Sequence, residues 1–143
     1  MARFMPENWP IPAIDTFNRD FFTSGKLVVQ ECVACGTLQH PPEEICHKCH
    51  EMEFGARETN GRGTIYSYII VHNPPSPALA DAVPYAVVLV SLDEHPQIRI
   101  LGNVLNRKPD ELEIGQKLEA VFEEIKDEEA GEDLLVPQWE VVG

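Results

Sequence analysis

The sequence is poor in positive charge. Its 143 residues include 11 Lys and Arg against 24 Asp and Glu, which gives a formal net charge of −13 at pH 7. Binding to nucleic acid depends on Lys and Arg that displace the counterions of phosphates, and a negative field repels polyanions. The composition therefore argues against a nucleic-acid-binding function.

Long hydrophobic runs are also missing. No segment approaches the roughly 18 apolar residues of a membrane span. The first ten residues, MARFMPENWP, contain Pro6 and Pro10 and lack the continuous apolar region of a secretory signal peptide. A chain of this length suits one domain, or one domain with a small appendage. We therefore expect a cytoplasmic protein without a membrane segment.

Familiar catalytic signatures are missing as well. No serine stands in a G-x-S-x-G turn, and the phosphate-binding G-x-G-x-x-G and Walker patterns are absent. His72, at the end of an expected strand near Tyr66 and Tyr68, is the best isolated candidate for acid–base chemistry. A single histidine at a strand end more often serves packing or hydrogen bonding. The sequence thus contains no recognisable catalytic constellation.

Cysteine is absent outside one stretch, CVACGTLQHPPEEICHKCH. Cys32 and Cys35 form one C-x2-C pair, and Cys46 and Cys49 form a second pair ten residues later. Four thiolates in two such turns suit the tetrahedral coordination of zinc. A site with four protein ligands has no open position for water or substrate. The spacing therefore predicts structural Zn²⁺ held by these four residues.

Other chemistries of the four cysteines are less compatible with the sequence. Disulfides are rare in cytosolic proteins. Neither C-x2-C motif opens a helix of a βαβ unit, as a thioredoxin-like redox motif would. Iron in a rubredoxin-like site fits the same ligand count and stays an alternative. Three histidines lie nearby, and because four thiolates complete the site we expect them at the surface: His40, His47 and His50.

Each C-x2-C pair is followed by a position where a left-handed backbone is expected. Gly36 occupies this position after the first pair, and glycine adopts the conformation without steric cost. His50 occupies it after the second pair, and histidine tolerates the conformation better than most residues do. The two turns are therefore predicted to have the same backbone shape.

Residues 1–26 read as an N-terminal arm. Prolines favour an extended start, and a short helix is expected between Asp15, as the N-cap, and Gly25, as the stop. Phe17, Phe21 and Phe22 recur at helical spacing and give this helix an aromatic face. A short helix cannot bury such a face alone. We expect it to lie on the body of this protein or on another subunit.

After a cysteine module at residues 27–60, the hydrophobic pattern changes to the alternation of β-strands. It indicates a mainly β fold in which residues 61–143 form a small closed barrel of five strands. The acidic residues between 110 and 133 are expected on a solvated strand face and in an acidic turn, and the alternative is a contact for a basic surface of a partner. The five predicted strands are Gly63–His72, Tyr85–Glu94, Gln97–Leu105, Gln116–Ile125 and Leu134–Val142.

Several longer stretches resemble one known family. LVVQECVACGTLQHPP is followed in order by GTIYSY, HNPPSPALADAVPY and VSLDE. In these stretches, from about Phe17 to Glu124, the chain is similar to the OB-fold acyl-CoA-associated proteins that carry a rubredoxin-like zinc ribbon, formerly a domain of unknown function. The resemblance implies an OB-fold barrel and a non-catalytic accessory subunit. Its partners would be thiolase-like or hydratase-like subunits that act on coenzyme A thioesters, in hetero-oligomers such as a heterotetramer.

The resemblance further implies that acyl-CoA is the substrate of the complex and that the partner performs the reaction, such as thiolase or steroid side-chain aldolase chemistry. Arg62 and His72 are candidate acyl-CoA contacts. Glu43 and His47 depart from the family, which commonly has arginine and proline at those positions. Apolar anchors for the partner are expected in the arm and in the Pro-rich loop, which otherwise forms a lid on the barrel: Trp9, Phe17, Phe21, Phe22, Pro74, Pro75, Pro77 and Leu79. The alternative functions are a nucleic-acid-binding module and a rubredoxin-like electron carrier.

Overall fold

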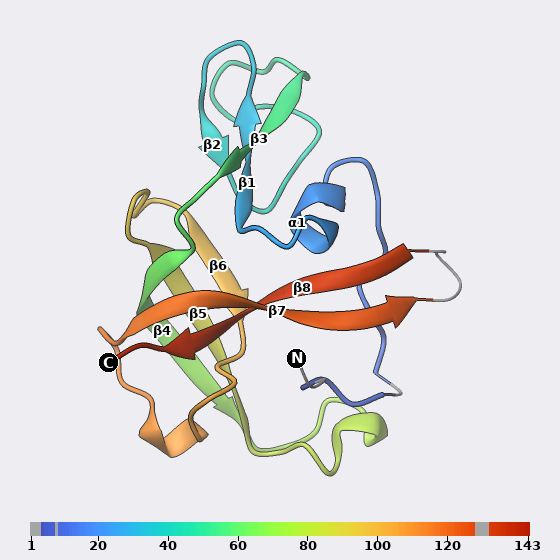
Figure 1. The fold of residues 1–143 in the computed structure, drawn as a ribbon, viewed down its shortest axis with the longest axis vertical. Coiled ribbons are helices and arrows are strands. Elements are labelled where there is room, and N and C mark those ends of the chain that lie inside the picture. Colours follow the sequence, from blue (N-terminus) through green and yellow to red (C-terminus); the bar gives the residue numbers. More distant parts are fainter. Residues whose placement is uncertain (1–3, 8, 128–131) are drawn as a thin grey trace.

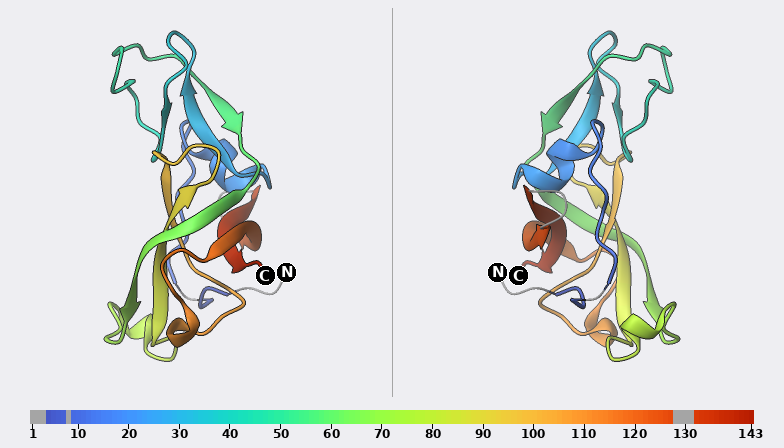
Figure 2. Two further views of the ribbon diagram at one scale, coloured as in Figure 1. Left: turned by 90° about the vertical axis from the view of Figure 1, so that its left-hand side faces the viewer. Right: turned by 90° about the vertical axis from the view of Figure 1, so that its right-hand side faces the viewer.

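A computed structural model describes residues 4–7, 9–127 and 132–143 of the chain. A small three-stranded sheet stands at one end of the elongated molecule and a larger five-stranded sheet at the other, with the only α-helix of the described residues between them (Figures 1 and 2). In the described part of the chain, no helix is long and apolar enough to cross a membrane. The mainly β fold class predicted from the sequence is confirmed.

The helix of the arm is shorter than predicted. α1 comprises Arg19–Thr23 and follows Asn18, so Asp15 is not its N-cap and Phe17 lies outside it. The Asp15 carboxylate instead accepts hydrogen bonds of 2.8 Å from the backbone N–H groups of Phe17 and Asn18. Aspartate often forms such local turns, which compete with the helical backbone. Gly25, with φ 71°, follows the helix where a stop was expected.

The three-stranded sheet carries the cysteines. β1 (Val28–Cys32) is the central strand, and β2 (Leu38–Gln39) and β3 (Phe54–Glu58) pair with it on either side, both antiparallel. Cys32 is the last residue of β1, and the second cysteine pair lies in the long connection between β2 and β3. The sheet thus brings the two pairs to one end of the module.

The five predicted strands form the second sheet, a nearly closed barrel in the order β6-β5-β4-β7-β8. All neighbouring pairs are antiparallel, and a parallel bridge between Val104 and Trp139 joins the two ends of this order. The strands are β4 (Arg62–Val71), β5 (Tyr85–Leu92), β6 (Arg99–Gly102), β7 (Lys117–Asp127) and β8 (Glu132–Val141), with short 3₁₀ turns η1 (Pro77–Leu79) and η2 (Pro109–Glu111).

β6 is shorter than the sequence indicated. The N–H of Asn103 leaves the ladder and donates to the Gln138 side chain at 2.8 Å, which ends the pairing with β5 after Gly102. β7 differs in another way, because it pairs with β4 only at Lys117–Glu119 but follows β8 along its whole length. The distal half of the β7–β8 hairpin therefore extends away from the barrel (Figure 1).

Two hydrophobic clusters stabilise this arrangement. A small one lies on the distal hairpin at Ile125, Leu134 and Val136, and the arm and helix cover it with Met5, Ile11, Ile14 and Phe22. The main cluster fills the barrel around the fully buried Trp139, and it also includes Leu27 and Val29 from the cysteine module. The module and the barrel consequently share one core.

Candidate metal centre

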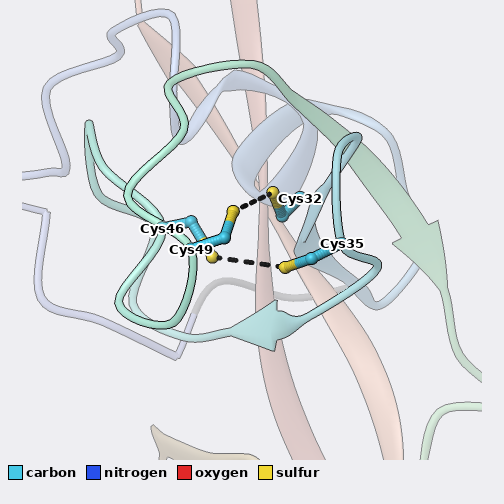
Figure 3. Close-up of side chains that lie close together, drawn as sticks. All are labelled: Cys32, Cys35, Cys46 and Cys49. Carbon is cyan, nitrogen blue, oxygen red and sulfur yellow. Dashed lines mark hydrogen bonds between the residues drawn. The ribbon is translucent and has the colours of Figure 1, made fainter.

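The four cysteine sulfurs converge on one point. Their Sγ atoms all lie within 4.8 Å of one another. The sulfurs of Cys32 and Cys49 are 3.5 Å apart, and those of Cys35 and Cys46 are 3.7 Å apart (Figure 3). A tetrahedral zinc site with Zn–S bonds of about 2.3 Å requires sulfur separations of about 3.8 Å. The arrangement therefore fits zinc.

The two C-x2-C turns have the same hydrogen bonds. The carbonyl of Cys32 accepts from the N–H of Gly36 at 2.8 Å, and the carbonyl of Cys46 accepts from the N–H of His50 at 2.9 Å. The N–H of each of these cysteines donates to the residue five positions later. Gly36 has φ 75° and His50 has φ 66°, so both adopt the left-handed conformation that the sequence predicted.

Four crowded thiols differ in how readily they ionise. The Thr37 hydroxyl, 3.0 Å from the sulfur, is the main cause that lowers the pKa of Cys35 to about 6. A backbone hydrogen bond from Glu51 lowers the pKa of Cys49, but loss of solvent and the neighbouring thiols outweigh it and raise the pKa to about 12. Four thiolates this close need a cation, and a divalent metal ion supplies it.

A buried pair of glutamines supports the second turn. Gln30 and Gln39 are opposite each other on β1 and β2, and the side-chain amide of Gln39 donates to the Gln30 oxygen at 2.8 Å. Gln30 also exchanges two hydrogen bonds with the backbone of Glu43. Gln39 accepts from the N–H of His47 at 3.1 Å and thereby fixes the residue after Cys46. Neither glutamine was predicted from the sequence to support the metal site.

The three histidines beside the cysteines occupy different environments. His47 and His50 are exposed, as expected, and His47 Nδ1 lies 2.7 Å from the Gln39 oxygen. His40 is half-buried, because its ring packs against Phe21 with 4.9 Å between ring centroids. Burial lowers the pKa of His40 to about 4. This contact joins α1 to the cysteine module, which single-sequence spacing does not reveal.

The predicted apolar anchors divide into inward and outward groups. Phe21 and Phe22 pack against the two clusters of this protein, so the aromatic face of the helix rests mainly on the protein's own body. Trp9 and the buried Leu79 line a common hollow of about 340 Å³, which joins the arm to the Pro-rich loop. The outward group comprises Phe17, Pro74, Pro75 and Pro77.

The candidate acyl-CoA contacts are far apart. Arg62 begins β4 and His72 follows its last residue, and both side chains are exposed. A strand of this length spans about 30 Å. The structure therefore does not bring the two residues together. Among the described residues, the four cysteines are the only cluster of possible metal ligands.

Glu123 was expected on a solvated strand face, and this expectation is wrong. Its side chain is completely buried, at 0% exposure. One carboxylate oxygen accepts hydrogen bonds from the backbone N–H groups of Phe4 and Met5 at 2.5 and 2.7 Å, and the other accepts from Gln138 at 3.1 Å. Glu123 thus anchors the arm to the hairpin. The acidic turn predicted next to it falls partly on residues 128–131, outside the described residues.

Comparison with known proteins places both parts of the chain in one family. Residues 19–54 match the family profile "ChsH2, rubredoxin-like zinc ribbon domain", and residues 56–123 match "ChsH2, C-terminal OB-fold domain". A "DUF35 domain-containing scaffold protein" of Methanocaldococcus jannaschii is 37% identical over 111 residues, which are 77% of this chain and 75% of that protein.

Two larger relatives are named as hydratase subunits. The "probable enoyl-CoA hydratase alpha subunit" of Thermomonospora curvata is 42% identical over 109 residues, which cover 74% of this chain and 33% of the relative. The "3-oxo-4,17-pregnadiene-20-carboxyl-CoA hydratase alpha subunit" of Mycobacterium tuberculosis is 30% identical over 66% of this chain and 29% of the relative. The chain therefore spans about a third of the length of these proteins.

A solved structure with the same fold is described as "Ltp2-ChsH2(DUF35) aldolase". It superposes with a TM-score of 0.71 at 36% sequence identity. The superposition covers 92% of this chain and 98% of the chain it matches. The likeness extends over the arm, the cysteine module and the barrel together.

Proposed function

Because this chain belongs to the ChsH2 family, in which a rubredoxin-like zinc ribbon precedes an OB-fold domain, we propose that it is a non-catalytic accessory subunit of an acyl-CoA enzyme. It binds and stabilises a thiolase-like or hydratase-like subunit and helps to shape the acyl-CoA site of the complex. A thiolase-like partner forms or breaks a carbon–carbon bond, as a thiolase or a steroid side-chain aldolase does. The complex is a hetero-oligomer of the cytoplasm.

The observation that carries this proposal is the superposition on nearly a whole chain of an aldolase assembly. The side chains of this protein support it independently. All four cysteines are used in one closed cluster. The reacting groups are therefore expected on the partner.

Zinc has a structural role in this proposal. Cys32, Cys35, Cys46 and Cys49 hold the ion, and the glutamine pair and the left-handed turns present their sulfurs. When bound, the ion neutralises four crowded thiolates and ties β1 to the loop between β2 and β3. Structural zinc binds comparable small modules with a free energy on the order of 10–16 kcal/mol. Because the site does not exist in the unfolded chain, this binding free energy stabilises the folded state.

One alternative rests on the same cysteines. Iron in this four-thiolate site would make the protein an electron carrier. A purified iron form is coloured, whereas a zinc form is colourless, so absorption in the visible range separates the two.

The proposed function is tested by isolation of the tagged chain from its native host under mild conditions. We expect a thiolase-fold or hydratase-fold acyl-CoA subunit in constant ratio to the chain and one zinc per chain by elemental analysis. Activity of the complex on acyl-CoA substrates should be lost when the chain is removed and restored when it is added back. A chain that arrives alone, or that is active without a partner, contradicts the proposal.

A further inference from the structure

Strand β5 is apolar on both faces. Ala86, Val88, Val90 and Leu92 are buried inside the barrel. Tyr85, Val87, Leu89 and Ser91 alternate with them on the outer side, where they are partly buried, and three of these four are apolar. The outer face of an antiparallel sheet in contact with water normally carries polar residues. Because β5 lies between β6 and β4, its apolar outer face would be stabilised by another molecule or segment that shields it from water.

The neighbouring strands extend the same apolar face. Ile69 of β4 is opposite Val87, and Leu101 of β6 is opposite Leu89. Ile69 and Leu101 are 62% and 64% exposed, which is high for aliphatic side chains in the middle of a sheet. We call Ile69, Val87, Leu89 and Leu101, with Tyr85, the outer barrel face. It is continuous across three strands.

On its β6 side, the outer barrel face forms the floor of a groove of about 690 Å³. The opposite wall consists of Phe17 and Phe21 from the arm and helix and of Pro41 and Pro42 from the cysteine module. A groove of this size can hold a run of several side chains from another molecule. Met5 and Asp15 of the arm line this groove as well, and Glu123 holds the backbone N–H of Met5.

One cation stands in this apolar surface. The Arg99 guanidinium lies 3.9 Å from the centre of the Tyr66 ring, and Arg99 also lines the groove. Among the described residues, Arg99 forms none of the ion pairs with carboxylates. The carboxylate that lines the groove, Asp15, accepts hydrogen bonds from the backbone of its own turn. A molecule bound in the groove could place a carboxylate beside Arg99 and form an ion pair with its guanidinium, partly shielded from water.

We propose that the outer barrel face and the groove receive an amphipathic segment of the acyl-CoA enzyme partner, with apolar side chains along one side and a carboxylate that pairs with Arg99. This inference rests on the proposed function and specifies where on this chain the partner binds. A second copy of the chain fits less well, because it brings another net charge of −13 and, across a two-fold axis, another set of cations of the same kind.

The test uses the acyl-CoA enzyme that copurifies with the wild-type chain, separated from it and then titrated with purified variants. Leu101→Asp places a charge in the apolar face, and Arg99→Glu reverses the cation. We expect each change to weaken binding about 100-fold, as for central interface residues. Ile114→Asp, at an exposed position, and Arg107→Glu, at a partly exposed one, introduce the same changes outside the groove and should leave the affinity within about threefold.

Zinc content and the unfolding midpoint of each variant should equal those of the wild type, which shows that the fold is kept. If the wild type binds the enzyme and both groove variants bind it equally well, this inference is wrong while the proposed function stands. If the wild type binds no acyl-CoA enzyme, both fail. If the isolated wild type sediments as a dimer that Leu101→Asp converts to a monomer, the occupant is a second copy and the inference is overturned.

Discussion

His50 has a backbone conformation that most side chains avoid. With φ 66° it repeats the shape of Gly36 in the other cysteine turn, and its side chain is exposed. A non-glycine residue in this region destabilises the folded state by roughly 1–2 kcal/mol. Glycine removes this strain, but it loses more conformational entropy on folding, which offsets part of the gain. We expect His50→Gly to keep its zinc and to raise the free energy of unfolding by up to about 1 kcal/mol, measured by urea denaturation of the zinc-loaded protein.

Gly36→Ala is the matched control for this substitution. It introduces the same conformational cost into the first turn, where a Cβ would meet no neighbouring atom. It should therefore lower the free energy of unfolding by about 1 kcal/mol through the backbone alone. A clear loss of stability in His50→Gly would show that the histidine side chain supports the turn.

His40 should make the stability of the protein dependent on pH. Because burial lowers its pKa from 6.5 to about 4, the folded protein binds a proton less readily than the unfolded chain does. The contribution of neutral His40 is therefore complete above about pH 6.5 and is lost as the pH falls towards 4, by at most about 3 kcal/mol. His40→Phe keeps a ring against Phe21 and cannot titrate.

The measurement is urea denaturation of the zinc-loaded wild type and His40→Phe between pH 7 and 4.5. The stability of the wild type relative to the variant should decrease steadily over this interval. Both proteins keep the same cysteine cluster, so acid effects on the metal cancel in the comparison. Parallel pH profiles would mean that His40 ionises in the folded state as freely as in the unfolded chain.

Single residues are predictable from the sequence where their chemistry is local. The four cysteines and the left-handed residues after them follow from spacing within one short stretch. The burial of Glu123 and the partial burial of His40 were not predicted, because their environments are built by segments distant in the chain. The arm buries Glu123, more than a hundred positions away in the sequence, and the helix covers His40. Nothing in the neighbouring residues indicates either contact.

At the scale of single elements, β4 depends on the absence of a side chain at one position. A Cβ built on Gly63 would lie 2.4 Å from Val90 Cγ1 and 2.9 Å from the carbonyl oxygen of Ser91, both on β5. The two strands could not keep their spacing around a methyl group. We expect Gly63→Ala to lower the free energy of unfolding by about 1–3 kcal/mol, measured by urea denaturation.

Gly55→Ala is the corresponding change in β3 of the other sheet. No atom lies within 4 Å of the Cβ it would introduce. Its effect should stay within about 0.5 kcal/mol, and the reduced freedom of the unfolded chain favours a small gain. Equal effects of the two alanines would show that the close approach of β4 and β5 relaxes without cost.

The strands were predicted well, because alternating apolar residues indicate a strand with one buried face. This pattern can be recognised within each segment without knowledge of the rest of the chain. Element ends were less predictable. Asp15 has the chemistry of an N-cap, but it forms a separate turn and the helix begins at Arg19. The departure of the β7–β8 hairpin from the barrel depends on where β4 stops pairing, which no local pattern encodes. The division at residues 26 and 60 stays a prediction.

At the scale of the whole molecule, Glu123 connects the arm to the hairpin. Its carboxylate satisfies two backbone N–H groups of the arm and one side-chain amide in a fully buried position. Glu123→Gln retains the size but loses the charge and one acceptor oxygen, so it leaves buried groups unpaired at a cost of about 1–3 kcal/mol. We expect the arm to detach more often and to be cleaved faster in limited proteolysis followed by mass spectrometry.

Glu124→Gln changes the same functional group on the next residue of the strand, where the side chain is exposed. It should leave the cleavage rate of the arm unchanged. If the two variants are cleaved at the same rate as the wild type, the hydrophobic contacts of the arm with the distal hairpin are sufficient to hold it.

The two walls of the groove belong to different parts of the molecule. The barrel supplies Leu101 and Val87, whereas the loop between the cysteine pairs supplies Pro41 and Pro42. The connection between the cysteine module and the barrel is held by Thr59, whose N–H and hydroxyl both donate to the carbonyl of Leu27 at 2.9 Å. In the proposed complex, zinc stabilises the fold of the cysteine module, and the acyl-CoA enzyme binds to the module and the barrel together. Both therefore favour the same folded arrangement of the groove. By thermodynamic reciprocity each raises the affinity for the other, so at equilibrium with a competing chelator the assembled complex should retain more of its zinc than the free subunit does.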